Sequence, residues 1–245
     1  MSKDPIHPLS IEDVCELCSR PEFVEHYRQS IKEVGGLWES ERILVTQLFS
    51  REAKLLDLGC GVGRVSFGLR EEGYSNVEGM DFSPAMIDAA KTSARERGID
   101  TPFAVGDATN LSLPDADFDG VIFGFGGLMQ IPGRPLRRKA LREIQRILKP
   151  GGWFLFTTHD REMEEVSEFW ETAIREGPGE FGDICEEGPH GLVFVHVPDI
   201  DEVDSDLRET GWSDIRSFLR SDIAEESDAV EESADNCRFW LARKE

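Results

Sequence analysis

The chain has 245 residues, and its 49 acidic residues against 27 Lys and Arg residues give a formal net charge of -22 at pH 7. Its 39% of hydrophobic residues suit one α/β domain with additions better than two full domains. The negative charge disfavours nucleic acid and anionic membranes as partners, because both bind basic patches. The sequence has no apolar run near the roughly 20 residues of a membrane span. Met1 to Ser10 lack the hydrophobic core of a signal peptide, so we expect a cytoplasmic protein.

Residues 1–50 predict helices, which we interpret as a cap over a ligand site because they precede the first predicted strand. Pro21 suits the first turn of the second helix, and a Gly-Gly pair ends it. Cys15 and Cys18 form a single CxxC without a second Cys or His pair nearby, so we interpret them as neighbours on one helix, with no metal site. The predicted helices are 11–18, 22–34 and 38–49.

The segment Leu55 to Arg64 reads Leu-Leu-Asp-Leu-Gly-Cys-Gly-Val-Gly-Arg and predicts a buried strand, a glycine turn and the start of a helix. Glycine permits positive φ and lets a ligand approach the main chain closely. The spacing is GxGxG and not the dinucleotide pattern GxGxxG, because residue 64 is Arg. The acid Asp57, at the end of the strand, suits a ligand with positive charge better than a diphosphate.

Strands and helices alternate over residues 51–160, which predicts an α/β fold with a doubly wound, mostly parallel, Rossmann-like sheet. Ser83 is the expected N-cap of one helix, and Lys149-Pro150-Gly151-Gly152 is a strong stop after another. The predicted strands are 53–58, 76–80, 101–105, 118–123 and 153–158, and the predicted helices are 63–72, 84–97 and 136–148.

Residues 161–198 interrupt this alternation, and we interpret them as an insertion after strand five. They predict an amphipathic helix over 162–175, a polar loop over 177–188 and a strand over 191–197. A helix over 199–209 and strands over 215–219 and 237–242 follow. Residues 222–235 are rich in acids, and we expect an exposed connection there.

Ligands of an open parallel sheet bind outside the carboxyl ends of its strands. The first three predicted strands each end in a carboxylate, and we expect these carboxylates to meet in one crevice. The strand-end residues are Asp57, Asp81 with Phe82, Gly106-Asp107-Ala108, and Phe123-Gly124.

As an ordered set, these motifs resemble the class I S-adenosylmethionine-dependent methyltransferases. The resemblance covers roughly residues 35–160, from the glycine turn to the Leu-Lys-Pro-Gly-Gly segment before strand five. It implies one domain over 1–245 with a seven-stranded sheet whose last strand is antiparallel. The parts are a helical cap (1–50), a cofactor-binding core (51–160), a substrate-side insertion (161–198) and the C-terminal part of the sheet (199–245).

The resemblance implies S-adenosyl-L-methionine as cofactor. Asp57 would orient the methionine ammonium, Asp81 would accept hydrogen bonds from both ribose hydroxyls, and Asp107 would accept one from the adenine amino group. Arg64 either holds the methionine carboxylate or faces solvent, and Tyr27 either reaches the methionyl group or is an ordinary core or surface residue. The implied cofactor-binding residues are Asp57, Gly59, Cys60, Gly61, Gly63, Asp81, Phe82, Gly106, Asp107, Ala108, Phe123 and Gly124.

The acceptor is less defined than the cofactor. A Phe-Gly-Phe-Gly-Gly-Leu segment follows strand four where enzymes that methylate DNA amines or glutamine carry an Asn-Pro-Pro-Tyr type motif. Together with the acidic charge, this favours a small-molecule acceptor, methylated by in-line displacement. His159, Asp160 and His196 are the candidate catalytic residues if the nucleophile must lose a proton.

Two other functions remain open at this point. An acid about twenty residues after a glycine turn also suits the ribose of a nicotinamide cofactor, so an NAD(P)-dependent oxidoreductase is an alternative. A non-catalytic adenosyl-cofactor-binding protein is the second, because cofactor motifs do not specify acceptor chemistry.

Overall fold

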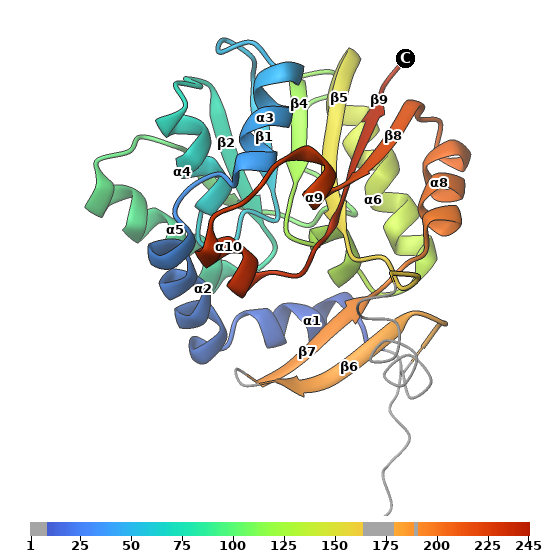
Figure 1. Ribbon diagram of the computed structural model, residues 1–245, viewed down its shortest axis with the longest axis horizontal. Coiled ribbons are helices and arrows are strands. Elements are labelled where there is room, and N and C mark those ends of the chain that lie inside the picture. Colours follow the sequence, from blue (N-terminus) through green and yellow to red (C-terminus); the bar gives the residue numbers. More distant parts are fainter. Residues whose placement is uncertain (1–8, 164–178, 189–190) are drawn as a thin grey trace, which may run out of the picture.

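The computed structural model describes residues 9–163, 179–188 and 191–245, and its centre is a seven-stranded sheet of order β3-β2-β1-β4-β5-β9-β8 (Figure 1). β1 to β5 run parallel, whereas β9 is antiparallel to both β5 and β8. The predicted mostly parallel, seven-stranded Rossmann-like sheet is therefore confirmed. The strands are β1 (Leu55–Leu58), β2 (Val77–Asp81), β3 (Phe103–Val105), β4 (Phe118–Phe123), β5 (Leu148–Thr158), β8 (Ser213–Leu219) and β9 (Arg238–Arg243).

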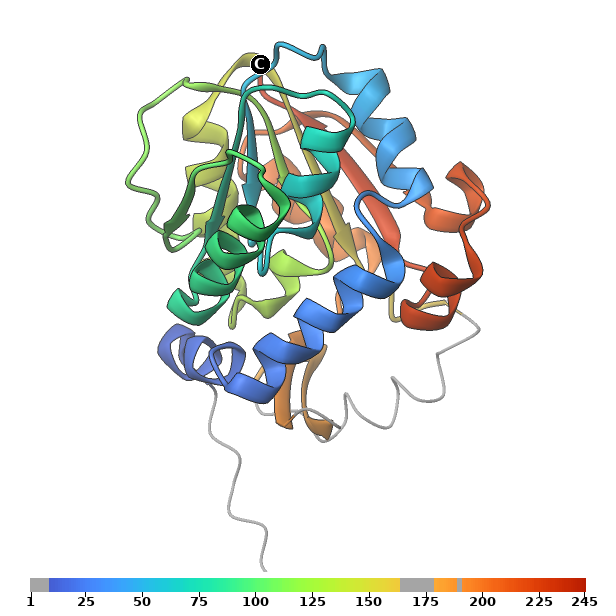
Figure 2. The same ribbon diagram turned by 90° about the vertical axis from the view of Figure 1, so that its left-hand side faces the viewer.

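Helices cover both faces of the sheet, because its central strands are apolar on both sides. Leu56 and Phe154 point into a core completed by α6 (Arg134–Ile147) and α8 (Ile200–Glu209). Leu55 and Leu155 point to the opposite side, toward α3 (Glu39–Leu48) and α4 (Arg64–Glu71), and α5 (Pro84–Arg97) packs on β2 and β3. Figure 2 shows α3 and α6 on opposite sides of the strands.

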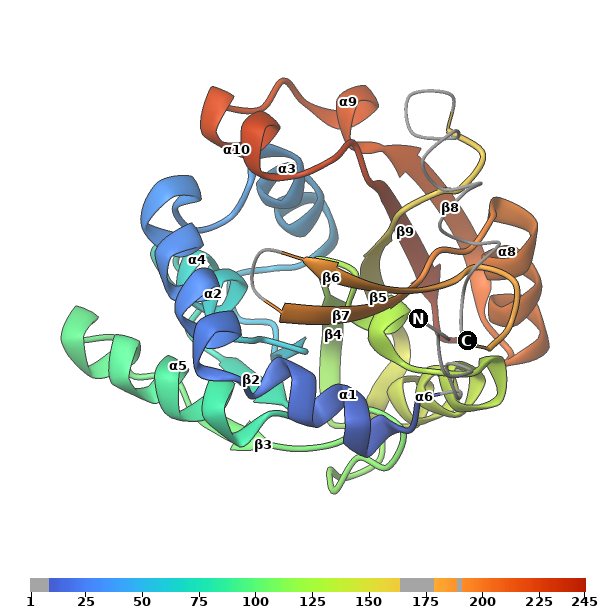
Figure 3. The same ribbon diagram turned by 90° about the horizontal axis from the view of Figure 1, so that it is seen from below.

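Several segments gather beyond the carboxyl ends of the parallel strands. In Figures 1 and 3, α1 and α2 lie along this end of the sheet beside a two-stranded hairpin. α1 packs against β7 of the hairpin, and α2 packs against α10. These segments are α1 (Ile11–Cys18), α2 (Pro21–Val34), η1 (Gly127–Gln130), β6 (Asp183–Gly188), β7 (Gly191–His196) and α10 (Asp228–Ser233), whereas α9 (Arg220–Ile223) packs against α3 on one face of the sheet.

The second half of the chain differs in part from its predicted elements. The prediction of a polar loop over 177–188 is wrong at its end, because Asp183–Gly188 form β6, which pairs with β7. The acidic connection over 222–235 is mostly exposed, as expected, but it also contains α10 and part of α9 and buries Val230. The helix expected over 162–175 lies, from residue 164 on, outside the described residues. Within the described ranges, no helix is long and apolar enough to cross a membrane.

Candidate functional site

Asp57 holds the glycine turn and the helix that follows it. Its side chain is 2% exposed, and Oδ2 accepts hydrogen bonds from Ser66 N at 2.9 Å and Ser66 Oγ at 2.6 Å. Burial raises the pKa of Asp57 to about 7, although the Ser66 hydrogen bonds and the nearby Arg64 oppose the rise. The carboxylate thus anchors the first turn of α4 from the end of β1.

Gly59 and Gly61 of the glycine turn lie in different surroundings. Gly59 and Gly61 have φ values of +64° and +52°, which favour glycine. A Cβ on Gly59 would lie 2.5 Å from the Phe123 ring, whereas a Cβ on Gly61 would meet no atom within 4 Å. Cys60 lies between them with its side chain buried in a core cluster, and Gly63 is the N-cap of α4. The main chain at Gly61 therefore borders open space.

Asp81 ends β2 and bridges two loops. Oδ2 accepts a hydrogen bond from Gly61 N and Oδ1 accepts one from Ser83 N, both at 2.8 Å. Ser83 in turn caps α5, as predicted. Burial raises the pKa of Asp81 to about 6, and the two backbone hydrogen bonds oppose this rise. Each carboxylate oxygen keeps a lone pair for a further donor.

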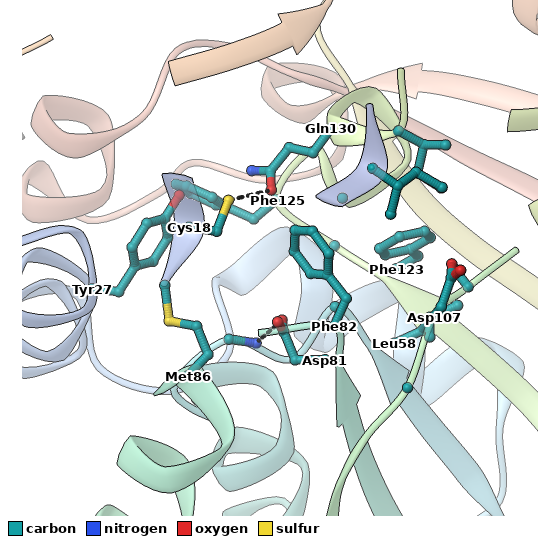
Figure 4. Close-up of a pocket in the computed structure, with 18 of the residues that line it drawn as sticks. Cys18, Tyr27, Leu58, Asp81, Phe82, Met86, Asp107, Phe123, Phe125 and Gln130 are labelled. Carbon is teal, nitrogen blue, oxygen red and sulfur yellow. Dashed lines mark hydrogen bonds between the residues drawn. The ribbon is translucent and has the colours of Figure 1, made fainter. Parts of the chain in front are cut away.

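The strand ends enclose a first cavity of about 800 Å³ including its open mouth. Figure 4 shows Asp81, Phe82, Asp107 and Phe123 gathered at the sheet end, with Cys18 and Tyr27 across from them. Asp107 accepts hydrogen bonds from Thr109 N at 2.7 Å and Thr109 Oγ1 at 2.8 Å, which fix its loop. Further lining residues are Gly59, Gly61, Met86, Gly106, Ala108, Gly124, Phe125 and Gln130.

A second cavity of about 570 Å³ adjoins the first at Gly59, Gly61 and Gly124. Asp57, Cys60, Tyr27 and Arg64 line it, together with Ser30, Trp38, Phe125 and Ser233. Tyr27 lines both cavities, and its ring lies 6.2 Å from that of Phe125. The structure thus favours the interpretation of Tyr27 as a site residue over an ordinary surface residue.

Arg64 does not face solvent. Its guanidinium donates to both carboxylate oxygens of Glu41, at 2.7 and 2.6 Å, and to the Gly36 carbonyl at 2.9 Å. Glu41 is 4% exposed. Sequence reasoning missed Glu41, because nothing in the pattern of α3 separates it from Glu39, the other acid of that helix, which is only partly buried.

The three candidate catalytic residues lie in different surroundings. His159, after β5, lines a third cavity, whereas Asp160 is 4% exposed and pairs with Arg238 at 3.0 Å. His196 is 1% exposed, and its ring nitrogens lie 2.8 Å from Asp183 and Glu202. Asp160 lines none of these three cavities, and His196 lines a separate pocket with Met129 and Arg137, so the catalytic role expected of these two residues stays a prediction.

Comparisons with known proteins agree with this geometry. Residues 55–152 match the family model of a methyltransferase domain. A demethylmenaquinone methyltransferase of Thermus thermophilus is 37% identical over 100 residues, which is 40% of this chain and 44% of the relative. Phosphoethanolamine N-methyltransferase 1 of Arabidopsis thaliana is 26% identical over 85% of this chain and 40% of its own length. The chain thus spans less than half the length of these relatives.

Solved structures show the same fold. An S-adenosylmethionine-dependent methyltransferase from Methanosarcina mazei superposes with a TM-score of 0.69 and 22% identity, covering 85% of this chain and 98% of its own. Phosphoethanolamine N-methyltransferase 2 of Haemonchus contortus gives 0.65 and 17%, covering 94% of this chain and 60% of its own. Residues 55–152 thus match a methyltransferase domain, and the described chain has the fold of S-adenosylmethionine-dependent methyltransferases, as its motifs predict.

Proposed function

We propose that the protein transfers a methyl group from S-adenosylmethionine to a small-molecule acceptor. The observation that carries this proposal is the joining of the first and second cavities across the glycine turn, with Asp81 and Asp107 in one and Asp57 in the other. Three carboxylates spaced along one elongated crevice suit a ligand that presents hydroxyls, an amine and a cationic centre.

The residues present fit this cofactor. Asp81 has lone pairs for two ribose hydroxyls, and Phe82 offers a ring for the adenine. Asp107 and the Ala108 amide would contact the adenine edge. Gly106, which precedes them in the same loop, has no side chain that could occupy the space of the ligand. Cys60 and the main chain around Gly61 would border the methionyl part, with Asp57 facing its ammonium.

The reacting end would lie near Phe123 and Gly124, where the two cavities meet. When bound, S-adenosylmethionine supplies an electrophilic methyl group and leaves as a neutral thioether. The contribution of the protein is then alignment of the acceptor with that methyl group, because displacement requires the three atoms in line. His159 is the candidate base that we favour, since it lines a cavity next to this point.

We also propose that residues 1–50 act as a cap and residues 161–198 as the substrate-side insertion of one cytoplasmic domain. Tyr27, from α2, would then close the methionyl end. Acceptors of the relatives, demethylmenaquinone and phosphoethanolamine by name, are small molecules. This agrees with the enclosed cavities.

Isothermal calorimetry with S-adenosylhomocysteine and with NAD and NADP separates this proposal from the oxidoreductase alternative. We expect saturable binding of S-adenosylhomocysteine and none of the dinucleotides. Binding of a dinucleotide alone would overturn the proposal. A screen of acceptors that monitors S-adenosylhomocysteine release then tests catalysis, and cofactor binding without turnover of any acceptor would favour the non-catalytic alternative.

A further inference from the structure

The base of the β6–β7 hairpin brings three potential metal ligands together. Glu180 Oε1, Asp183 Oδ1 and His196 Nδ1 all lie within 4.8 Å of one another. His196 Nδ1 is 2.8 Å from Asp183 Oδ1 and 3.7 Å from Glu180 Oε1. His196 and Asp183 are buried, so the cluster differs from acids that are solvated at the surface. One imidazole and two carboxylates form a donor set that suits a divalent transition-metal ion.

A short stretch of backbone holds these ligands in place. Asp183 and His196 face each other as a cross-strand pair of the hairpin. Glu180 precedes Asp183 in a turn that a hydrogen bond from Asp183 N to the Glu180 carbonyl closes at 3.0 Å. Asp183 Oδ2 accepts a hydrogen bond from Glu180 N at 2.9 Å, which leaves Oδ1 directed at the imidazole. The arrangement is therefore built locally and needs little rearrangement to surround an ion.

Glu202 of α8 holds the opposite side of the imidazole. Its Oε1 atom lies 2.8 Å from His196 Nε2. A histidine that binds a metal through one ring nitrogen typically donates the N–H of the other nitrogen to a carboxylate or carbonyl, which fixes the orientation of the ring. With Nε2–H donated to Glu202, the lone pair of Nδ1 faces the Asp183 and Glu180 carboxylates.

The charges around His196 leave room for a divalent cation. Among the described residues, four carboxylates and two guanidinium groups form one linked cluster with the imidazole. If the imidazole is neutral, two negative charges stay uncompensated, and a divalent cation balances them. The carboxylates belong to Glu180, Asp183, Asp199 and Glu202, and the guanidinium groups to Arg137 and Arg161.

Arg137 is the group that a metal ion would displace from Glu180. Its Nη2 atom lies 2.5 Å from Glu180 Oε1 and 3.1 Å from Glu202 Oε1. Glu180 Oε1 is buried but accepts no hydrogen bond of ordinary geometry from the described residues. The Glu180 side chain is 32% exposed and has space to turn, whereas Arg137 keeps Glu202 and the Ile131 carbonyl as partners. The exchange therefore leaves both groups paired.

We propose that Glu180, Asp183 and His196 bind one divalent transition-metal ion, which fixes the base of the β6–β7 hairpin. The role is structural, and no step of methyl transfer passes through the ion. β7 packs against α1, and Ile11 and Cys18 of α1 line the first cavity. The ion would thus stabilise part of the cavity wall without touching the cofactor, and the proposal is independent of the proposed function.

Binding of Mn²⁺ to the full chain tests the site. Mn²⁺ is a better probe than Zn²⁺, because the free cysteines, Cys15 and Cys18 among them, would also attract Zn²⁺. The protein is treated with EDTA, desalted and titrated with Mn²⁺ in a large excess of MgCl₂, which occupies the exposed carboxylates. We expect electron paramagnetic resonance to show one retained Mn²⁺ per chain, with nitrogen coupling from an imidazole in pulsed spectra. Complete displacement by Mg²⁺, or bound Mn²⁺ without nitrogen coupling, overturns the proposal.

Variants assign the ligands. His196→Gln should abolish the nitrogen coupling and weaken Mn²⁺ binding by about tenfold or more, since even indirect partners of a metal site contribute about that much. Glu180→Gln changes a partly exposed side chain, so it should fold as wild type by circular dichroism and weaken binding similarly, which keeps the test valid if His196→Gln does not fold. His26→Gln, at an exposed position on α2, is the control and should bind Mn²⁺ as wild type. Wild-type affinity in Glu180→Gln overturns the site.

Discussion

Arg64 and Glu41 form a buried two-pronged ion pair that joins the glycine turn to α3. The Nη1–Oε2 distance is 2.7 Å and the Nη2–Oε1 distance is 2.6 Å, with side-chain exposures of 11% and 5%. Arg64 directly follows the turn that borders the second cavity. The pair therefore sets the wall of that cavity through a helix from the N-terminal part of the chain.

Breaking this pair should destabilise the whole domain. Glu41→Gln leaves the Arg64 charge buried without its counter-ion, which typically costs about 3–5 kcal/mol. Urea unfolding followed by tryptophan fluorescence measures the loss. Glu25→Gln is the matched control, because Glu25 is exposed and should change the free energy of unfolding by less than about 1 kcal/mol. A Glu41→Gln effect as small as that of the control contradicts the assignment.

Asp81→Asn should weaken binding of S-adenosylhomocysteine at least tenfold, because charge-assisted hydrogen bonds contribute about 1.5–3 kcal/mol each. Calorimetry measures the dissociation constant directly. Asp88→Asn, an exposed position on α5, serves as the control and should leave the constant unchanged. Equal affinities of the two variants would remove Asp81 from the proposed ribose site.

Binding should also depend on pH in a defined direction. Burial raises the pKa of Asp81 to about 6, and ligand hydroxyls prefer its ionised form. Affinity should therefore fall as pH drops below about 6 and reach a plateau at higher pH. Calorimetry at pH 5 to 8 provides the profile, and in Asp81→Asn it should be shallower. A wild-type affinity that increases toward pH 5 is incompatible with this assignment.

Without a bound metal ion, the β6–β7 hairpin should be most stable at mildly acidic pH. Burial would lower the pKa of His196, but hydrogen bonds to Asp183 and Glu202 raise it. The contribution of His196 to the stability of the hairpin is therefore lost as pH rises through the pKa of the folded state. Burial would raise the pKa of Glu202, but the His196 hydrogen bond and charge, with Arg137, lower it to about 2. The contribution of Glu202 to the stability of the hairpin is lost as pH falls below 4.5, the ordinary pKa of a glutamate. Both contributions are complete between pH 4.5 and 6.5.

Hydrogen exchange of the β7 amides, corrected for intrinsic rates, should show maximal protection in that interval. His196→Gln should remove the alkaline loss and lower protection by about 1.5–3 kcal/mol, the contribution of a charged hydrogen bond. His26→Gln again is the control. Protection that rises steadily to pH 9 in the wild type would refute the role of His196.

The fold could be predicted where local signals suffice. The bounds of β4 and α5 match the expectations, because β4 has a continuous apolar end, Val121 to Phe123, and Ser83 and Gly98 mark the ends of α5. β6 was beyond such reasoning, since Asp183–Gly188 is polar and becomes a strand through pairing with β7. Likewise Glu226 accepts hydrogen bonds from the amides of Glu39 and Ser40, far away in the sequence.

The candidate site was likewise predictable only in part from the sequence. Asp81 and Asp107 reach one cavity because parallel strands end at the same edge of a sheet. The environment of Asp160 and His196 depends on Arg238, Asp183 and Glu202, which come from other elements. Pattern and spacing cannot reveal such partners, and the catalytic role expected of these two residues stays a prediction.

The double bridge from Asp81 to Gly61 N and Ser83 N has a thermodynamic consequence. The carboxylate that would receive a ligand already fixes the loops on either side of it. The binding surface is therefore preorganised, and ligand association loses little conformational entropy in these loops.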